Sequence, residues 1–292
     1  MVPIDLSGKH AFVTGVADDR GFAWAIAKSL KAAGAGVHLA SHPRVVSIVE
    51  RILRRPGSAE SRVLPYGVGG EFQPDSLFGC DVAYDTLADM PAEVREQRGY
   101  ADTDASIAGA FEAYQRHSGG APLDVLIHSV AFSPEIDRAH LDTSRAAYLT
   151  ASSVSAYSLV ALTRAALPLM EGRNGAVVGL TYAASSRVVP GYGGGMASAK
   201  AALECDAREL AWFAGDKGHR VNLISAGPFP SRAARSIGPI DEMIRLTAEK
   251  SPLRRPIAAQ EVADAALYLC SPLSSGITGE ILYVDCGAHI MS

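Results

Sequence analysis

The chain has 292 residues, of which 48% are hydrophobic, so it is long enough to bury a sizeable core in one large domain. Its formal net charge is −4 with 20% charged residues, a balance that gives no electrostatic reason to expect a nucleic-acid partner. The four cysteines are scattered without metal-ligand spacing, so we expect reduced thiols and no metal site.

The amino-terminal segment, MVPIDLSGKHAFVTG, lacks the basic and then apolar pattern of a secretory signal. No apolar run in the sequence has the length that we expect of a membrane span. We therefore expect no membrane partner and a cytoplasmic protein of bacterial type, or a plastid protein if a transit peptide has been removed.

Short β-branched runs alternate with helical patterns along the first half of the chain. The sequence predicts strands over 10–15 and 36–41, with a helix over 22–34 between them. Residues 54–80 are rich in Gly, Pro and Ser, which favours a loop with one strand near DSLFGCD. The next strand, LDVLIHS (123–129), is almost entirely apolar, as expected of a strand buried on both faces.

The same alternation continues to the end of the chain. It predicts helices over 148–170, 196–214 and about 260–270, and strands over 175–182, 219–227 and 280–287. Strand–helix alternation throughout predicts an α/β fold, namely a Rossmann-like doubly wound parallel sheet of about seven strands with helices on both faces. No change in composition divides the sequence, so we expect a single domain over residues 1–292.

The turn after the first strand, TGVADDRGFAWAIA, has features of a phosphate-binding loop. Gly15 and Gly21 carry no side chain that would block a close approach, and the helix N-terminus that follows attracts anions. A dinucleotide fingerprint normally has a third glycine, and Ala23 or Ala25 stands in its place here. The pattern also fits an ordinary strand–helix turn, but its position after the first strand favours a dinucleotide.

Two further strand ends carry candidate ligand contacts. Asp81 follows the predicted third strand, where its carboxylate would accept a hydrogen bond from an adenine amino group; a solvated loop aspartate is the alternative. Ser129, Val130 and Ala131 follow the fourth strand, at the edge where ligands bind in open α/β sheets. We interpret His128, which lies within that strand, as a core histidine and not as a catalytic one.

The segment TYAASSRVVPGYGGGMASAK (181–200) carries the most specific pattern in the sequence. It lacks the Tyr-x-x-x-Lys arrangement of common short-chain dehydrogenases, because Met196 stands four residues after Tyr192. The spacing of Tyr182, Tyr192 and Lys200 instead resembles that of the enoyl-acyl-carrier-protein reductases, a divergent branch of the short-chain dehydrogenase/reductase superfamily. It is most similar to the plant, apicomplexan and chlamydial type, and the resemblance, which includes ADDRGFAWAIAKSL and RVNLISAGPFPSRAA, covers nearly the whole chain.

This resemblance implies the reduction of trans-2-enoyl thioesters by NADH in fatty acid biosynthesis, on acyl carrier protein and by a homotetramer. Tyr192 would donate a hydrogen bond to the thioester oxygen as the enolate forms, and Lys200 would bind the nicotinamide ribose. Tyr182 would contact the substrate or shape the pocket. The cofactor-binding positions that the resemblance implies are Gly15, Ala17, Gly21, Phe22, Ser41, His42, Asp81, Val82, Ser129, Val130, Ala131, Thr181, Lys200, Pro228 and Ser231.

The three glycines at 193–195 have a physical explanation in this setting. In a continuous helix, eight residues would place the lysine about 80° around the axis from the tyrosine. A non-helical glycine segment resets this register, and we also expect it to let the backbone pass close to the substrate or cofactor.

The second strand departs from the family pattern. The family usually has Gly-Thr-Trp there, with the tryptophan near the adenine, whereas this chain has Ala40, Ser41 and His42, followed by Pro43 and Arg44. No acid stands at this strand end to bind a ribose 2′-hydroxyl, and the basic side chains suit a 2′-phosphate. NADH is the implied cofactor and NADPH the alternative.

Residues 228–256 begin and end with proline, and we expect them to form a lid over the substrate. Ile240, Met243, Ile244 and Thr247 share one helical face within it. Basic residues outnumber acidic ones in this stretch, which predicts a surface that attracts an acidic acyl carrier protein; a solvated helix face is the alternative.

Two other functions stay open at this point. A short-chain ketoreductase is disfavoured by the missing Tyr-x-x-x-Lys pattern. A non-catalytic nucleotide-binding homologue is disfavoured because Tyr192 and Lys200 are both present.

Overall fold

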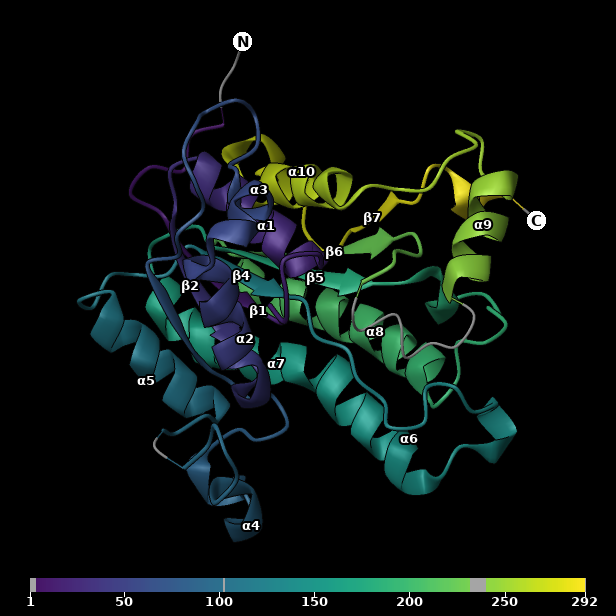
Figure 1. Cartoon of the computed structure of the whole chain (residues 1–292), viewed down its shortest axis with the longest axis horizontal. Helices are drawn as coiled ribbons and strands as arrows, with labels where there is room; N and C mark the ends of the chain where they lie inside the picture. The colour runs from purple at the N-terminus through teal and green to yellow at the C-terminus, as the bar shows by residue number, and fades with distance from the viewer. Residues whose placement is uncertain (1–3, 102, 232–239, 292) are drawn as a thin grey trace.

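A computed structural model of the chain describes residues 4–101, 103–231 and 240–291 (Figure 1). Its centre is a seven-stranded parallel sheet with the order β3-β2-β1-β4-β5-β6-β7. The strands are β1 (His10–Thr14), β2 (Gly36–Ser41), β3 (Ser76–Gly79), β4 (Val125–His128), β5 (Ala176–Thr181), β6 (Arg220–Ala226) and β7 (Ile281–Val284). Because the chain winds outward in both directions from β1 and β4, the sheet is doubly wound, and the predicted fold class is confirmed.

Helices cover both faces of the sheet because its strands are apolar on both sides. Ala11 and Val13 of β1 pack on the face that carries α1 (Phe22–Ala32), α2 (Pro43–Arg54) and α10 (Ala259–Cys270). Phe12, between them, packs on the opposite face with α5 (Ile107–His117), α7 (Ser158–Ala166) and α8 (Met196–Gly215). Strands buried on both faces account for the continuous apolar runs in the sequence.

Two of these helices, α2 and α5, were not predicted. Helix α2 begins directly after β2 with Pro43 in its first turn, and the ring of His42 caps it by accepting a hydrogen bond from the N–H of Arg44. Helix α5 is capped by Ser106, whose Oγ accepts from the N–H of Gly109 at 3.2 Å. The connections between β2 and α5 also hold the short helices α3 (Ala59–Arg62) and α4 (Ala92–Arg95).

The predicted helix over 148–170 begins earlier and is interrupted. It consists of α6 (Arg145–Ser152), a π-helical turn at Ser153–Tyr157, α7, and a 3-10 turn at Leu167–Met170. Contrary to our expectation, the run Arg145–Met170 is long and apolar enough to cross a membrane by length and composition. However, 56% of its apolar window is buried inside the fold, where α7 packs against α5, α8 and β4, as a core helix does.

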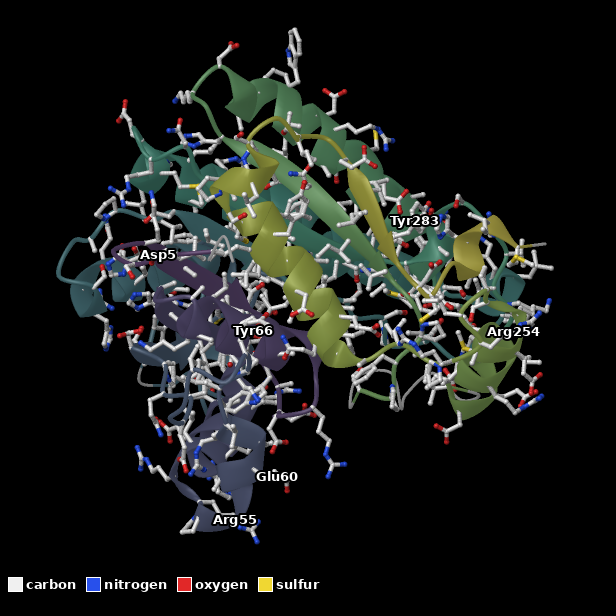
Figure 2. All side chains as sticks on the ribbon, turned by 90° about the horizontal axis from the view of Figure 1, so that it is seen from above. Asp5, Arg55, Glu60, Tyr66, Arg254 and Tyr283 are labelled. Atoms are coloured by element: carbon white, nitrogen blue, oxygen red, sulfur yellow. The ribbon has the colours of Figure 1, made fainter. Side chains whose placement is uncertain are left out.

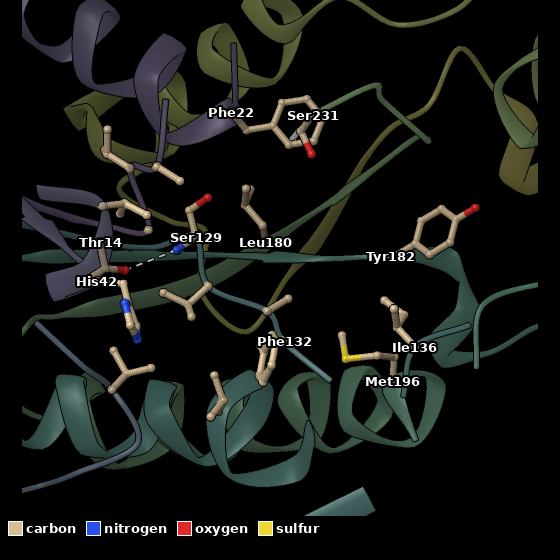
Figure 3. Close-up of a pocket in the computed structure, with 18 of the residues that line it drawn as sticks. Thr14, Phe22, His42, Ser129, Phe132, Ile136, Leu180, Tyr182, Met196 and Ser231 are labelled. Atoms are coloured by element: carbon tan, nitrogen blue, oxygen red, sulfur yellow. Dashed lines mark hydrogen bonds between the residues drawn. The ribbon is translucent and has the colours of Figure 1, made fainter. Parts of the chain in front are cut away.

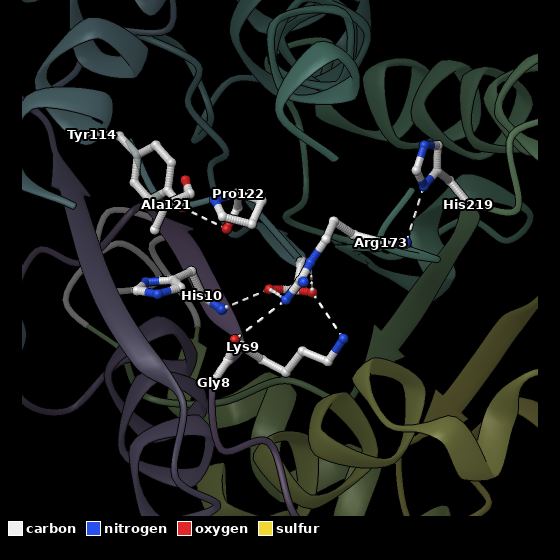
Figure 4. Close-up of polar contacts among 10 residues, drawn as sticks. Gly8, Lys9, His10, Tyr114, Ala121, Pro122, Arg173 and His219 are labelled. Atoms are coloured by element: carbon white, nitrogen blue, oxygen red, sulfur yellow. Dashed lines mark hydrogen bonds and ion pairs between the residues drawn. The ribbon is translucent and has the colours of Figure 1, made fainter. Parts of the chain in front are cut away.

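The amino-terminal ends of the strands are joined by a buried carboxylate (Figure 4). Asp124, directly before β4, accepts hydrogen bonds from Lys9 Nζ at 3.0 Å, Arg173 Nε at 2.9 Å and the N–H of His10 at 2.9 Å. Its side chain is only 5% exposed. The cluster connects β1, β4 and the segment before β5, so it fixes the sheet at the edge away from the strands' carboxyl ends.

Candidate active site

A cavity of about 750 Å³ lies along the carboxyl ends of the strands (Figure 3). Ligands of doubly wound sheets bind at this edge, and small-molecule sites have volumes of about 300–1,000 Å³. The walls come from the β1–α1 turn, the ends of β2, β4, β5 and β6, the segment after β3, and helices α6, α8 and α9 (Ile240–Lys250).

Most of the predicted site residues line this cavity. They are Gly15, Ala17, Phe22, His42, Asp81, Val82, Ser129, Val130, Ala131, Thr181, Tyr182, Tyr192, Lys200, Pro228 and Ser231. Two predicted residues do not line it: Gly21 is the N-cap of α1, where its N–H donates to Asp18 Oδ1 at 3.1 Å, and Ser41 is buried within β2.

The β1–α1 turn has the properties of an anion site. Gly15 has a φ of 79°, and a Cβ at this position would collide with the carbonyl oxygen of Ser129, so glycine allows the turn to lie against the end of β4. The N-terminus of α1 has no side-chain cap. Its first N–H groups are therefore left to bind solvent or an anion, which the helix dipole favours.

Asp81 is held at the β2–β3 end of the cavity by two neighbours. Its Oδ2 accepts a hydrogen bond from the hydroxyl of Tyr100 at 2.7 Å and lies 3.6 Å from Nε2 of His42. Burial disfavours the charged form, but hydrogen bonds from His42, Tyr100 and the N–H of Ala83 outweigh it and hold the pKa of Asp81 below its ordinary value. The carboxylate is therefore ionised and oriented at neutral pH.

Arg44 lies at the same end, exposed, with its guanidinium donating to Gln97 Oε1 at 2.5 Å. Tyr100 and Gln97 line or support this end and were missed by the sequence analysis. Both come from the α4–α5 connection, which carries no local motif, so only the fold brings them to Asp81 and Arg44.

The two tyrosines of the central motif pack together at the other end of the cavity. The rings of Tyr182 and Tyr192 meet edge to face, with centroids 5.0 Å apart. Burial raises the pKa of Tyr182 to about 12, and burial followed by the neighbouring Tyr182 raises the pKa of Tyr192 further. Both hydroxyls therefore stay protonated at neutral pH and are available as hydrogen-bond donors.

Lys200 lines the cavity from the second turn of α8. Its Nζ donates to the carbonyl oxygen of Leu180 at 2.8 Å, and the residue is 4% exposed. Burial lowers the pKa of Lys200 to about 8, although the charge of Glu204 opposes the change. An ammonium group has three N–H donors, so this contact leaves two for a ligand.

Apolar side chains surround the tyrosine end. Figure 3 shows Tyr182, Ile136 and Met196 grouped there, away from Thr14 and His42 at the opposite end. Ile240 and Met243 of α9 complete this wall and pack against both tyrosines.

The sequence as a whole matches a known family. The sequence fits the family described as Enoyl-(Acyl carrier protein) reductase over residues 83–289. It is also 47% identical over 292 residues to the enoyl-acyl-carrier-protein reductase (NADH), chloroplastic, of Arabidopsis thaliana, a match that covers 99% of this chain and 74% of the relative.

The chain belongs to the enoyl-(acyl carrier protein) reductase family. Solved structures agree: the Plasmodium berghei enoyl-acyl-carrier-protein reductase with triclosan has a TM-score of 0.90 at 36% identity, with 97% of this chain and 98% of that chain covered. The Bacillus cereus enoyl-acyl carrier protein reductase with NADP+ and indole naphthyridinone has a TM-score of 0.79 at 33% identity, with coverages of 99% and 100%.

The triple glycine of this enoyl reductase chain also makes a close contact within the protein. Helix α8 begins at Met196, with Gly195 as a left-handed N-cap, so the segment is non-helical as predicted. A Cβ on Gly193 or Gly194 would collide with the carbonyl oxygens of Arg138 and Glu135. These glycines therefore allow a close approach to the segment after β4, and the expected approach to a substrate or cofactor stays a prediction.

The predicted lid lies partly outside the described residues, because 232–239 are not described. Of the predicted apolar face, Ile240 and Met243 are buried at the cavity and Ile244 is partly buried. Among the described basic residues of this stretch, Arg245 pairs with Glu242 and Glu249, and Arg255 pairs with Glu261.

Proposed function

We propose that this chain reduces the carbon–carbon double bond of trans-2-enoyl thioesters on acyl carrier protein, with NADH, as a step of fatty acid biosynthesis. The observation that carries the proposal is the convergence of Tyr182, Tyr192 and Lys200 on one apolar cavity at the carboxyl edge of the sheet. The named activity of the Arabidopsis relative at 47% identity supports it.

The described residues fit a nicotinamide dinucleotide. The uncapped N-terminus of α1 and Gly15 suit the pyrophosphate, and Asp81 suits a donor such as the adenine amino group. Ser129 and Thr181 line the same cavity as Lys200, whose remaining N–H groups suit the nicotinamide ribose. When bound, NADH supplies the hydride that reaches the β-carbon of the thioester.

Tyr192 stabilises the charge that this reduction places on the thioester oxygen. Its protonated hydroxyl donates a hydrogen bond to the enolate oxygen, and the apolar wall excludes the water that would weaken this bond. Lys200 adds positive potential beside the same oxygen while its remaining N–H groups bind the ribose. Tyr182 packs on Tyr192 and fixes the direction of its ring.

The choice between NADH and NADPH depends on the end of the cavity near Asp81. A 2′-phosphate would bring its charge close to the Asp81 carboxylate, which is ionised, and Arg44 is engaged with Gln97. We propose NADH as the preferred cofactor. NADPH is the second candidate, because Arg44 is exposed and the solved Bacillus cereus relative is named with NADP+.

A single assay tests the activity. The protein is incubated with crotonyl-CoA and either NADH or NADPH, and the loss of reduced nicotinamide absorbance is followed; acetoacetyl-CoA replaces crotonyl-CoA in a parallel series. Turnover with crotonyl-CoA supports the proposal. Turnover with acetoacetyl-CoA alone would assign a ketoreductase, and binding of cofactor without turnover on either substrate would assign a non-catalytic homologue.

The acyl carrier protein is proposed to approach over α9. Among the described residues of this surface, Arg245 and Arg255 form ion pairs, whereas Lys250 and Arg254 form none. Figure 2 shows Arg254. Neutralising both, as Lys250→Gln with Arg254→Gln, should raise KM for an acyl-carrier-protein substrate and leave KM for crotonyl-CoA nearly unchanged. An equal change in both would contradict the docking proposal.

We also propose a homotetramer, in part through β7. All four residues of this edge strand are only partly buried, and Tyr283 on it stacks on His289 at the surface (Figure 2). An unpaired sheet edge is normally covered or blunted. Light scattering of the purified protein tests this, and a monomer would refute it.

The compartment is proposed to be the bacterial cytoplasm or a plastid; the Arabidopsis relative is named chloroplastic.

A further inference from the structure

Lys200 and Glu204 lie one turn apart on α8 and hold two consecutive residues at the end of β5. Lys200 Nζ donates to the carbonyl oxygen of Leu180 at 2.8 Å, and Thr181 Oγ1 donates to Glu204 Oε1 at 2.8 Å. Both α8 side chains belong to residues less than a tenth exposed. The next residue is Tyr182, so the same two contacts fix the backbone from which this tyrosine projects into the cavity.

Burying a carboxylate at this position is unfavourable in free energy if the group only accepts a hydrogen bond from Thr181. An isolated buried carboxylate costs several kcal/mol unless a charge or hydrogen bonds compensate it. A glutamine would accept the same hydrogen bond without that cost. The negative charge of Glu204 therefore requires its own explanation, and residues four apart on a helix are neighbours.

The charge acts on Lys200 without occupying its donors. Burial lowers the pKa of Lys200 to about 8, and the field of Glu204 opposes this change. Among the described residues, Lys200 and Glu204 form no ion pair with each other. Glu204 therefore favours the ammonium form of Lys200, and the remaining N–H groups of Lys200 stay available to a ligand.

The other titratable groups around Lys200 carry no charge that would replace Glu204. His128 of β4 faces it, but burial, followed by the charge of Lys200, lowers the pKa of His128 to about 3, so this ring is neutral. Tyr182 and Tyr192 line the same cavity and have raised pKa values, so they are protonated and neutral too. Within the described parts of the chain, Glu204 is thus the anion that faces Lys200.

We propose that Glu204 is a positioning residue for enoyl reduction, which orients Thr181 and supplies the negative charge that keeps the Lys200 ammonium ion beside the cofactor. The inference rests on the proposed function, in which Lys200 binds the nicotinamide ribose and stabilises the enolate. Glu204 contacts neither reacting group itself. Its effect reaches the chemistry through Thr181 and Lys200.

The test separates the charge of Glu204 from its hydrogen bond. Glu204→Gln keeps an acceptor for Thr181 and removes the charge, whereas Thr181→Val removes the hydrogen bond and keeps the charge. Glu209→Gln, an exposed carboxylate on the same helix, is the matched control. Each variant is assayed with crotonyl-CoA and NADH across pH, and the side-chain titration of Lys200 is followed by NMR with labelled lysine, assigned through Lys200→Arg.

In Glu204→Gln the alkaline limb of kcat/KM should move to lower pH by roughly one pH unit, the lower end of the shift of about one to three units that a nearby opposite charge causes. Activity should then be near wild type at about pH 6 and roughly fivefold lower at about pH 8, where Lys200 of the variant has lost its proton. Thr181→Val should raise KM for NADH and leave the alkaline limb of kcat/KM at its wild-type pH. Glu209→Gln should change neither KM for NADH nor the position of this limb.

The NMR titration keeps this inference separate from the proposed function. If the wild-type protein does not reduce enoyl thioesters, the proposed function fails, while a lower Lys200 pKa in Glu204→Gln still supports the charge role. An unchanged Lys200 titration in Glu204→Gln overturns the inference. A loss of activity that is equal at all pH values also overturns it, because a merely structural role would have that result.

Discussion

Replacing Tyr192 by phenylalanine removes one hydroxyl and leaves the rest of the cavity wall in place. The ring retains its packing on Tyr182 and on Met243 of α9. Because burial raises the pKa of Tyr192, the wild-type hydroxyl carries its proton throughout the neutral range. The substitution therefore removes a protonated hydrogen-bond donor, and it should not change the pH dependence of activity near neutral pH.

The expected loss of kcat in Tyr192→Phe follows from the position of this hydroxyl beside the thioester oxygen of the substrate. A preorganised donor to a developing oxyanion contributes about 2.7–4 kcal/mol, which is roughly 10²–10³ in kcat. The Tyr192 hydroxyl has no hydrogen-bond partner among the residues that the structure describes, so the free energy of unfolding should change by less than about 0.5 kcal/mol. NADH affinity should also be nearly unchanged, because Lys200 and the β1–α1 turn are untouched.

Three measurements decide the matter: steady-state kinetics with crotonyl-CoA, a fluorescence titration with NADH, and urea unfolding. Tyr182→Phe is the matched control, since it changes the other ring of the same pair and should lower kcat by less than about tenfold. An unchanged kcat in Tyr192→Phe together with a large loss in Tyr182→Phe would refute the assignment and move the donor to Tyr182.

Three further results are expected. NADH should support turnover at least as well as NADPH, and Arg44→Ala should lower kcat/KM for NADPH only; a tenfold preference for NADPH, about 1.4 kcal/mol, would contradict the role given to Asp81. Asp124→Asn should lower the free energy of unfolding in urea by about 2 kcal/mol, because it removes a buried carboxylate that accepts hydrogen bonds from the partly exposed Lys9 and Arg173. Glu112→Gln, in an exposed pair, should have little effect, and equal midpoints for the two variants would show that the cluster is not stabilising. Burial, followed by the neighbouring His10, lowers the pKa of His38 from 6.5 to about 4, so the unfolded chain binds a proton there that the folded chain does not, and stability is lost as pH falls from 6.5 toward 4. His38→Gln should reduce the slope of unfolding free energy against pH, between about pH 5.5 and 7, by up to about 1 kcal/mol per pH unit, and an unchanged slope would show that His38 titrates normally.

The sheet could be predicted because its central strands are buried on both faces. A strand such as LDVLIHS has no polar side, so its sequence is a short apolar run with few other interpretations. Helix α2 was missed for a related reason. Its apolar residues are mostly β-branched, as in Val45, Val46 and Ile48, and its cap is a histidine, which is an unusual capping residue.

The site could be predicted where its residues lie close together in sequence. Tyr192 and Lys200 carry a specific spacing, and both line the cavity. Tyr100 and Glu204 carry no such signal. Tyr100 contacts Asp81, and Glu204 of α8 contacts Thr181 at the end of β5. The roles of Tyr100 and Glu204 therefore depend on contacts that only the folded chain defines.

The triple glycine shows the limit of a sequence motif most clearly. In the structure, Ser133 Oγ donates to the carbonyl oxygen of Gly194 at 2.7 Å, and the N–H of Gly193 donates to the carbonyl oxygen of Ile136 at 3.0 Å. These bonds require two backbones to lie closer than any Cβ allows. Because Ile136 and Tyr192 both pack against the buried cluster that contains Met196, the glycines help to fix the tyrosine at the cavity wall at the same time as they set the start of α8. The spacing between Tyr192 and Lys200 therefore reflects a contact between two protein segments, through which the positions of both functional side chains are determined together.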